Sequence, residues 1–216
     1  DSDNPKFYAT VLFGGVLGSL YSILQFVFAP IWGRLSDRTG RRPILLISIA
    51  GLCLAYLVWV FAGTFWMLVV SRLVAGVMGG NIAVATAAVA DLTGEKDRAK
   101  GMGLIGAAFG LGFILGPALG SMLGQIDLSK HLDLPGLNPF SAAALAGVVL
   151  SAWNIAWVYW KLPETHPPEA RRTGTTPGRS SNPLKLFSGE HLPAGVAPTN
   201  MVFFLFQTAF AGMEFT

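Results

Sequence analysis

The sequence predicts an all-α membrane protein built from long apolar helices. Of its 216 residues, 52% are hydrophobic and only 12% are charged, whereas a soluble domain carries roughly 25% charged residues. So few charged side chains could not cover the surface of a soluble protein. The 26 glycines agree, because glycine is commoner in membrane helices than in soluble ones. We therefore expect lipid to surround most of the chain.

Five complete apolar stretches are long enough to cross a bilayer, since a helix needs roughly 20 apolar residues to span the hydrocarbon. Turn-forming glycines and prolines separate them. The predicted spans are residues 8–32, 43–62, 65–90, 101–123 and 140–160, and a further stretch opens near residue 201. The sequence thus predicts five membrane helices and the start of another.

The basic residues predict how these spans are oriented. The loops after the first, third and fifth spans hold 12 of the 15 Lys and Arg residues. Short cytoplasmic loops are enriched in Lys and Arg, so these three loops are predicted to be cytoplasmic and the segment before residue 8 to lie outside. An odd number of spans, most simply one, is then expected upstream, and we expect the chain to be a piece of a longer protein.

The third of these basic loops is rich in proline, which predicts a linker. We expect residues 1–162 to form most of one transmembrane bundle, residues 163–199 to form a cytoplasmic central loop, and residues 200–216 to begin a second bundle.

The loop after the first span reads GRLSDRTGRRP from Gly33 to Pro43. Gly33 would allow a neighbouring backbone to approach closely, and Gly40 can adopt a positive φ that turns the chain back. The carboxylate of Asp37 could face the N-terminus of another helix, which favours a negative charge by about 0.3 to 1 kcal/mol. The alternative is that Asp37 is a solvated loop acid.

The arginines of this loop would need a carboxylate at the same depth, and Asp91, at the inner end of the 65–90 span, is so placed. We predict that this charge cluster latches two helix bundles at the inner face and breaks when they rock. The alternative is that the arginines only set the topology. The predicted inner-face gate comprises Gly33, Arg34, Asp37, Gly40, Arg41, Arg42 and Asp91.

Several polar residues lie inside predicted spans. Arg72 lies about seven residues into its span, where an unpaired charge costs at least about 2.5 kcal/mol, so it is either buried for a function or extended to the outer headgroups. Glu214 is a carboxylate in the final apolar stretch and a candidate proton or cation site. Gln25 and Asn81 could line a central cavity, or they could join one helix to another by hydrogen bonds.

The 101–123 span carries a stripe of small residues that includes Gly112, Gly116 and Gly120. Such a stripe lets two membrane helices pack closely. Pro117 cannot donate a backbone hydrogen bond, so the helix should bend there. We therefore predict a kinked helix that packs closely against another helix.

Together these motifs resemble those of the major facilitator superfamily. The Gly33–Pro43 loop resembles the signature that joins the family's helices 2 and 3, and the string RLVAGVMGG at 72–80 resembles its helix-4 pattern. The string GFILGPALG at 112–120 resembles the helix-5 signature of the family's antiporters, and LPET at 162–165 resembles the end of its helix 6. The drug:proton antiporter branch, with its tetracycline-resistance and tetracycline-transporter-like proteins, looks most similar. The resemblance implies the major facilitator fold, with an N-terminal six-helix bundle whose first helix is missing here, and the start of a second bundle.

The resemblance implies proton-coupled export of drug-like or organic-anion small molecules by alternating access. Arg72 and Glu214 would serve proton coupling, and Gln25 and Asn81 would border the substrate. The expected partners are a small-molecule substrate, protons and the lipid bilayer, without nucleic acid, and the protein is expected to act as a monomer in the plasma membrane or the inner membrane of a cell.

Two other functions stay open. One is a nutrient or sugar facilitator or symporter of the same superfamily, against which the Gly112–Gly120 motif argues. The other is a receptor or scaffold that keeps the fold without transport. Catalysis finds no support, because the three histidines lie far apart in loops, Cys53 is the single cysteine and no phosphate-binding glycine loop occurs. No metal or cofactor is expected, and a proton gradient would supply the energy.

Overall fold

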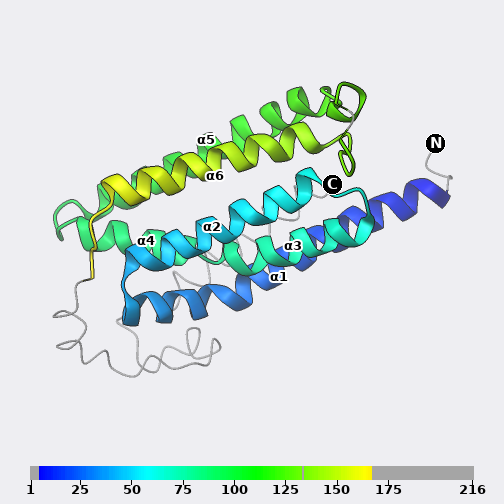
Figure 1. Ribbon diagram of the computed structural model, residues 1–216. Coiled ribbons are helices and arrows are strands. Elements are labelled where there is room, and N and C mark those ends of the chain that lie inside the picture. The colour runs from blue at the N-terminus through cyan, green and yellow to red at the C-terminus, as the bar shows by residue number, and fades with distance from the viewer. Residues whose placement is uncertain (1–4, 133, 167–216) are drawn as a thin grey trace. The chain divides into compact units, whose positions relative to one another are not determined.

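The computed structural model describes residues 5–132 and 134–166, with side chains from Gly14 onward. The described residues form α-helices and one short 3-10 helix, which confirms the all-α fold class (Figure 1). The helices are α1 (Pro5–Thr39), α2 (Arg41–Val60), α3 (Phe65–Gly79), α4 (Ile82–Leu92), α5 (Arg98–Gly124) and α6 (Ser141–Lys161), and the 3-10 helix is Leu128–Lys130.

Within the described residues, five helical segments are long and apolar enough to cross a membrane, which confirms the five predicted spans. The third consists of α3 and α4 together, from Phe65 to Leu92. The predicted start of a second bundle at residues 200–216, and the predicted central loop beyond residue 166, lie outside the described residues.

The structure corrects the first basic loop, because most of it is helical. Helix α1 continues to Thr39, seven residues beyond the predicted end of the span. The helix continues through the polar residues of this segment and past Pro30, and it ends only before Gly40. Gly40 alone makes the turn, with the predicted positive φ of 112°, which glycine adopts without steric cost.

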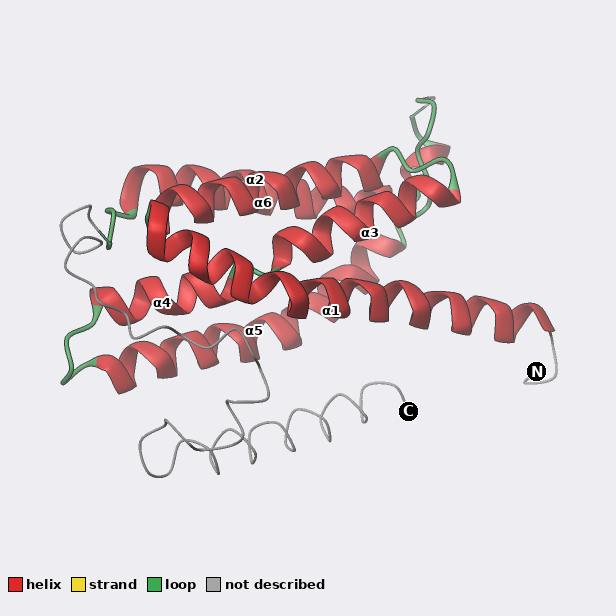
Figure 2. Ribbon diagram, turned by 90° about the horizontal axis from the view of Figure 1, so that it is seen from below, coloured by secondary structure: helices red, strands yellow, loops and turns green. Residues whose placement is uncertain are grey.

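The helices lie side by side in the order α6, α2, α3, α1 (Figures 1 and 2). A small apolar core joins α2, α4 and α6, and its buried members are Ile44, Leu45, Ile49, Val84, Ala88 and Val158. Many large apolar side chains face outward instead, among them Trp160 at 77% and Leu104 at 72% exposure. Such exposed apolar surface fits a solvent of lipid.

Glycines allow α1 and α3 to approach each other closely. A Cβ at Gly76 would lie 3.0 Å from the carbonyl oxygen of Tyr21, and a Cβ at Gly80 would lie 2.8 Å from the backbone nitrogen of Ala29. Gly80 also ends α3 and separates it from α4, so the predicted continuous 65–90 helix has a break at its middle. The close helix packing seen here therefore involves the Gly76–Gly80 segment.

The glycine stripe of α5 makes no such contact. A Cβ at Gly112, Gly116 or Gly120 would meet no described atom of another element within 4 Å. Every residue from 106 to 122 is exposed, and α5 continues through Pro117 to Gly124. Close packing through this stripe stays a prediction, because no described helix covers it.

Replacing Gly76 by alanine should destabilise the bundle. The added methyl group would force α1 and α3 apart, and such overpacking costs about 1 to 3 kcal/mol. The matched control is Gly103→Ala in α5, where a Cβ meets nothing within 4 Å and alanine gains up to about 1 kcal/mol of helix propensity. Melting temperatures of the purified variants in detergent should fall for the first and hold or rise for the second; equal shifts would contradict the close α1–α3 packing.

Candidate functional site

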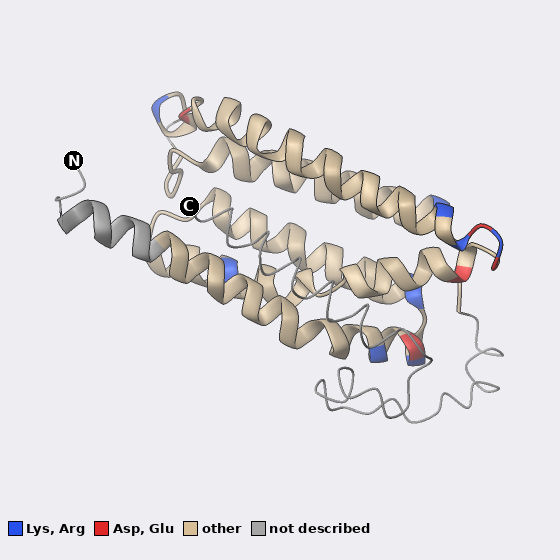
Figure 3. Cartoon of the chain, turned by 180° about the vertical axis from the view of Figure 1, so that it is seen from behind, with Lys and Arg blue, Asp and Glu red and all other residues tan. Residues whose placement is uncertain are grey.

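Charged residues gather mainly at the end of the helices where α1 passes to α2 (Figure 3). We call this the inner end, following the orientation predicted from the sequence, and we call the opposite end the outer end. Here Asp37, Arg41, Asp91 and Glu164 form a group that we name the inner charge cluster. Its members come from α1, α2, α4 and the segment after α6.

Arg41 lies at the centre of the inner charge cluster and is only 8% exposed. Its guanidinium forms ion pairs with Asp37 on α1 and with Asp91 on α4, the latter through Nε at 3.1 Å. It also donates a hydrogen bond of 2.7 Å to Oγ of Ser36. A buried charge needs paired and hydrogen-bonded neighbours, and Arg41 has them on two sides. The structure therefore brings together three residues of the predicted gate.

Glu164 completes the cluster and was not among the predicted gate residues. Its Oε1 accepts hydrogen bonds from the backbone N–H of Arg41 at 2.9 Å and of His166 at 3.0 Å. Arg41 is the first residue of α2, where free N–H groups and the helix dipole favour a negative charge. Among the described residues, then, the carboxylate that binds the N-terminus of α2 is that of Glu164 and not that of Asp37. The LPET string marked the end of α6, but nothing in it indicated this partner.

The other predicted gate residues lie around the cluster without joining it. Arg42 donates from Nη2 to the carbonyl oxygen of Tyr159, and its guanidinium lies 5.4 Å from the centre of that ring. It therefore binds the end of α6, while Arg41 binds the carboxylate of Asp91. Arg34 is exposed and bonds Pro30 of its own helix. No described atom of another element would come within 4 Å of a Cβ at Gly33.

Arg72 of α3 extends toward the last turn of α2. Its guanidinium carbon lies 3.7 Å from the centre of the Trp59 ring, a cation–π contact. Tyr21 of α1 and Tyr56 of α2 are near enough to interact electrostatically with it. Among the described side chains, no carboxylate forms an ion pair with Arg72. The residue is half-buried, so an aromatic ring is its main described partner.

The two predicted cavity amides have different environments. Gln25 donates a hydrogen bond of 3.0 Å to the carbonyl oxygen of Gly79 and so joins α1 to α3. Asn81, at the break between α3 and α4, donates to Oγ of Ser48 at 3.1 Å and also lines a cavity. Both therefore make the helix-to-helix bonds that the sequence left open. Glu214 lies outside the described residues.

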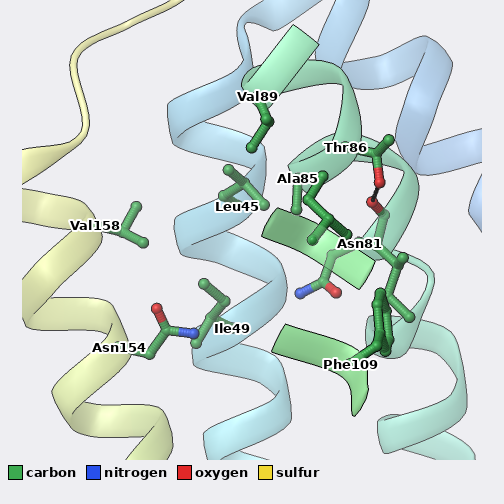
Figure 4. A pocket seen from close by; sticks show the side chains of 11 residues that line it. Leu45, Ile49, Asn81, Ala85, Thr86, Val89, Phe109, Asn154 and Val158 are labelled. Atoms are coloured by element: carbon green, nitrogen blue, oxygen red, sulfur yellow. Dashed lines mark hydrogen bonds between the residues drawn. The ribbon is translucent and has the colours of Figure 1, made fainter. Parts of the chain in front are cut away.

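A cavity of about 250 Å³ lies between α2, α4, α5 and α6 (Figure 4). Its wall is mostly apolar, with polar groups from Asn81, Thr86 and Asn154. The remaining lining residues are Leu45, Ile49, Ile82, Ala85, Val89, Ile105, Phe109 and Val158. An apolar wall with a few polar groups is typical of small-molecule sites.

Comparison with known proteins places the chain in a family. The sequence profile described as Major Facilitator Superfamily matches residues 5–216. The chain is 38% identical to bovine (Bos taurus) major facilitator superfamily domain-containing protein 10, over 98% of this chain and 46% of that protein. It is 45% identical to the class B tetracycline resistance protein of Escherichia coli, over 66% of this chain and 34% of that protein. The chain thus spans less than half the length of these relatives.

A solved structure agrees with the sequence matches. The crystal structure of the human organic anion transporter MFSD10 (TETRAN) superimposes with a TM-score of 0.64 and 39% sequence identity. The match covers 78% of this chain and 36% of the human protein. The described helices are therefore arranged as in the major facilitator fold of that transporter.

Changing Asp91 to asparagine should destabilise the inner end. Arg41 is nearly buried and would lose the charge of one of its two ion-pair partners, which costs about 1 to 3 kcal/mol. The matched control is Asp97→Asn, because Asp97 is exposed and its side chain does not cap α5; it should change stability by less than about 0.5 kcal/mol. Thermal unfolding of both purified variants measures the difference, and equal losses would argue against the Arg41–Asp91 pair.

Proposed function

The chain belongs to the major facilitator superfamily, and we propose that the protein of which it is part is a proton-coupled antiporter. It exports drug-like or organic-anion small molecules by alternating access between two helix bundles. The superfamily consists of integral membrane transporters and not of enzymes, so the substrate crosses the membrane unchanged. Residues 1–162 contribute to the first bundle, residues 163–199 form the cytoplasmic connection, and residues 200–216 begin the second bundle.

The observation that carries this proposal is the similarity to two kinds of relative at once. One is a group of tetracycline resistance proteins, to which the chain is up to 45% identical. The other is a human protein described as an organic anion transporter, at 39% identity. Substrates of both descriptions are small organic molecules, which supports this substrate class for the present protein.

The inner charge cluster supports a gate at the cytoplasmic face. Arg41 joins α1 to α4, and Glu164 joins the segment after α6 to the start of α2. The described part of the cluster therefore fixes the helix ends of one bundle to one another. The side chain of Asp37 is still 42% exposed. We propose that this exposed carboxylate is the group that meets the second bundle and is released when the bundles rock.

Arg72 and Glu214 are the proposed proton-coupling residues. Arg72 holds a charge inside the membrane region, and Glu214 would supply a carboxylate that can take up a proton. The helix-5 motif, with Gly112, Gly116, Pro117 and Gly120, supports exchange over uniport by its resemblance to the antiporter signature. In this proposal Asn81 borders the substrate through the cavity that it lines.

Uptake into inside-out membrane vesicles tests the transport class. Vesicles that carry the full-length protein and are energised to an acidic interior should accumulate tetracycline or fluorescein, because protons leaving the vesicle drive the solute in. Dissipating the pH gradient with nigericin should abolish accumulation, and vesicles without the protein provide the control. Accumulation that is indifferent to the gradient would contradict antiport and favour a facilitator, and absence of transport for every solute tested would favour a receptor.

Replacing Asp37 by asparagine tests the gate in the same vesicles. Loss of the carboxylate charge should destabilise one of the two alternating conformations by about 1 to 3 kcal/mol. Gradient-driven uptake should therefore slow by about ten-fold. Glu95→Gln is the control, because Glu95 is exposed in the connection between α4 and α5 and should leave the rate unchanged. Transport at the unsubstituted rate by the Asp37 variant would contradict the gate.

A further inference from the structure

The contact between Arg72 and Trp59 is unusual because the partner of the half-buried cation is an aromatic ring, whereas a carboxylate would be expected. The guanidinium carbon is 3.7 Å from the centre of the indole, and no described carboxylate pairs with Arg72. A charge in this region of the membrane is costly unless a neighbour compensates it. The negative face of an aromatic ring attracts a cation, and tryptophan does so best among the aromatic residues. The indole can therefore hold the charge in place without neutralising it.

A tryptophan at position 59 is energetically unfavourable in one respect. The indole N–H of Trp59 is buried and has no hydrogen-bond partner among the described residues, and an unmade hydrogen bond of a buried donor is unfavourable. A leucine or phenylalanine would fill this position without an unpaired N–H group. The presence of tryptophan is thus hard to explain by apolar packing alone and is explained by the stronger cation–π contact.

The connection between α5 and α6 fixes the backbone of Trp59. Asn138 donates from Nδ2 to the carbonyl oxygen of Trp59 at 3.1 Å. The hydroxyl of Ser141 donates to the carbonyl oxygen of Val60 at 2.6 Å. The carbonyl oxygen of Trp59 also accepts from the backbone N–H of Ala62 at 3.1 Å, so Asn138 adds a second bond to it. Ser141, the first residue of α6, supplies a partner to a carbonyl group at the C-terminal end of α2, where such groups lack partners within the helix. The ring of Trp59 therefore extends from a backbone that is held from outside its own helix.

We propose that Trp59 is a positioning residue for proton coupling, which holds the guanidinium of Arg72 by its ring, while Asn138 holds the backbone of Trp59. The inference deepens the proposed function and rests on it. The guanidinium carbon lies 3.7 Å from the centre of the ring, and in this proposal the N–H groups of Arg72 bind an anionic group. Tyr56 of α2 and Tyr21 of α1 are the described titratable groups that interact electrostatically with Arg72, and both helices pack against α3.

The test compares variants of the full-length protein in proteoliposomes, with fluorescein as the transported probe and an imposed pH gradient. Trp59→Leu should lower the initial rate about ten-fold and shift its pH dependence to that of Arg72→Gln. Trp59→Phe keeps a ring and should stay within about three-fold of the unsubstituted rate. The double variant Trp59→Leu with Arg72→Gln should be no slower than Arg72→Gln alone. Trp153→Leu is the control, because Trp153 is 70% exposed on α6.

A merely structural role predicts a different result. Trp59→Leu would then lower the yield of folded protein but leave the pH dependence and the rate per folded molecule unchanged, and this outcome would overturn the proposal. A second measurement does not depend on transport. The melting temperatures of the two single variants and of the double variant should not add, because both substitutions remove one contact. If the unsubstituted protein shows no gradient-dependent uptake, the proposed function fails, and additive losses of melting temperature would separately exclude the Trp59–Arg72 contact.

Discussion

The inner end of this structure depends on the burial of one cation. Arg41 is 8% exposed, and a charge removed from water must find partners of opposite charge close by. The carboxylates of Asp37 and Asp91 reach it from two different helices, and Glu164 binds its backbone N–H. Each of these groups can reach Arg41 only if the ends of α1 and α4 and the segment after α6 lie beside the start of α2. The positive φ of Gly40, the single residue between α1 and α2, lets α2 begin at Arg41 directly beside the end of α1.

A second constraint acts in the middle of the bundle. Helices α1 and α3 lie so close that a side chain at Gly76 or Gly80 would meet the backbone of α1. In lipid, apolar burial gives little reason for two helices to associate, so close packing of small residues and bonds such as that from Gln25 to Gly79 must do so. This contact aligns the two helices, and it places Tyr21 of α1 near Arg72 of α3.

The sequence predicted the features that local chemistry decides. The apolar stretches gave the five spans, and Gly40 gave the turn, because each follows from one segment alone. The break at Gly80 was not predicted, since it accompanies a close approach by the distant Ala29. Glu164 and Trp59 were missed for the same reason: their partners are 123 and 13 positions away along the chain, and no local pattern identifies them. The positions of the charged residues in the sequence indicated Asp91 as a partner for the arginines. They could not show that Arg41 binds Asp91 while Arg42 binds Tyr159.

Helix α2 carries both charged sites, one near each of its ends. Arg41 is its first residue, and Trp59, which holds Arg72, precedes its last residue. At 1.5 Å per residue this helix extends about 30 Å, and it is unbroken from Arg41 to Val60, past Pro43 in its first turn and Gly51 in its middle. Because the helix is continuous from one end to the other, we expect a change of tilt at its inner end to displace the indole at its outer end as well. The proposed gate and the proposed proton-coupling residue both contact this one helix, so they can respond to each other without a separate chain of contacts between them.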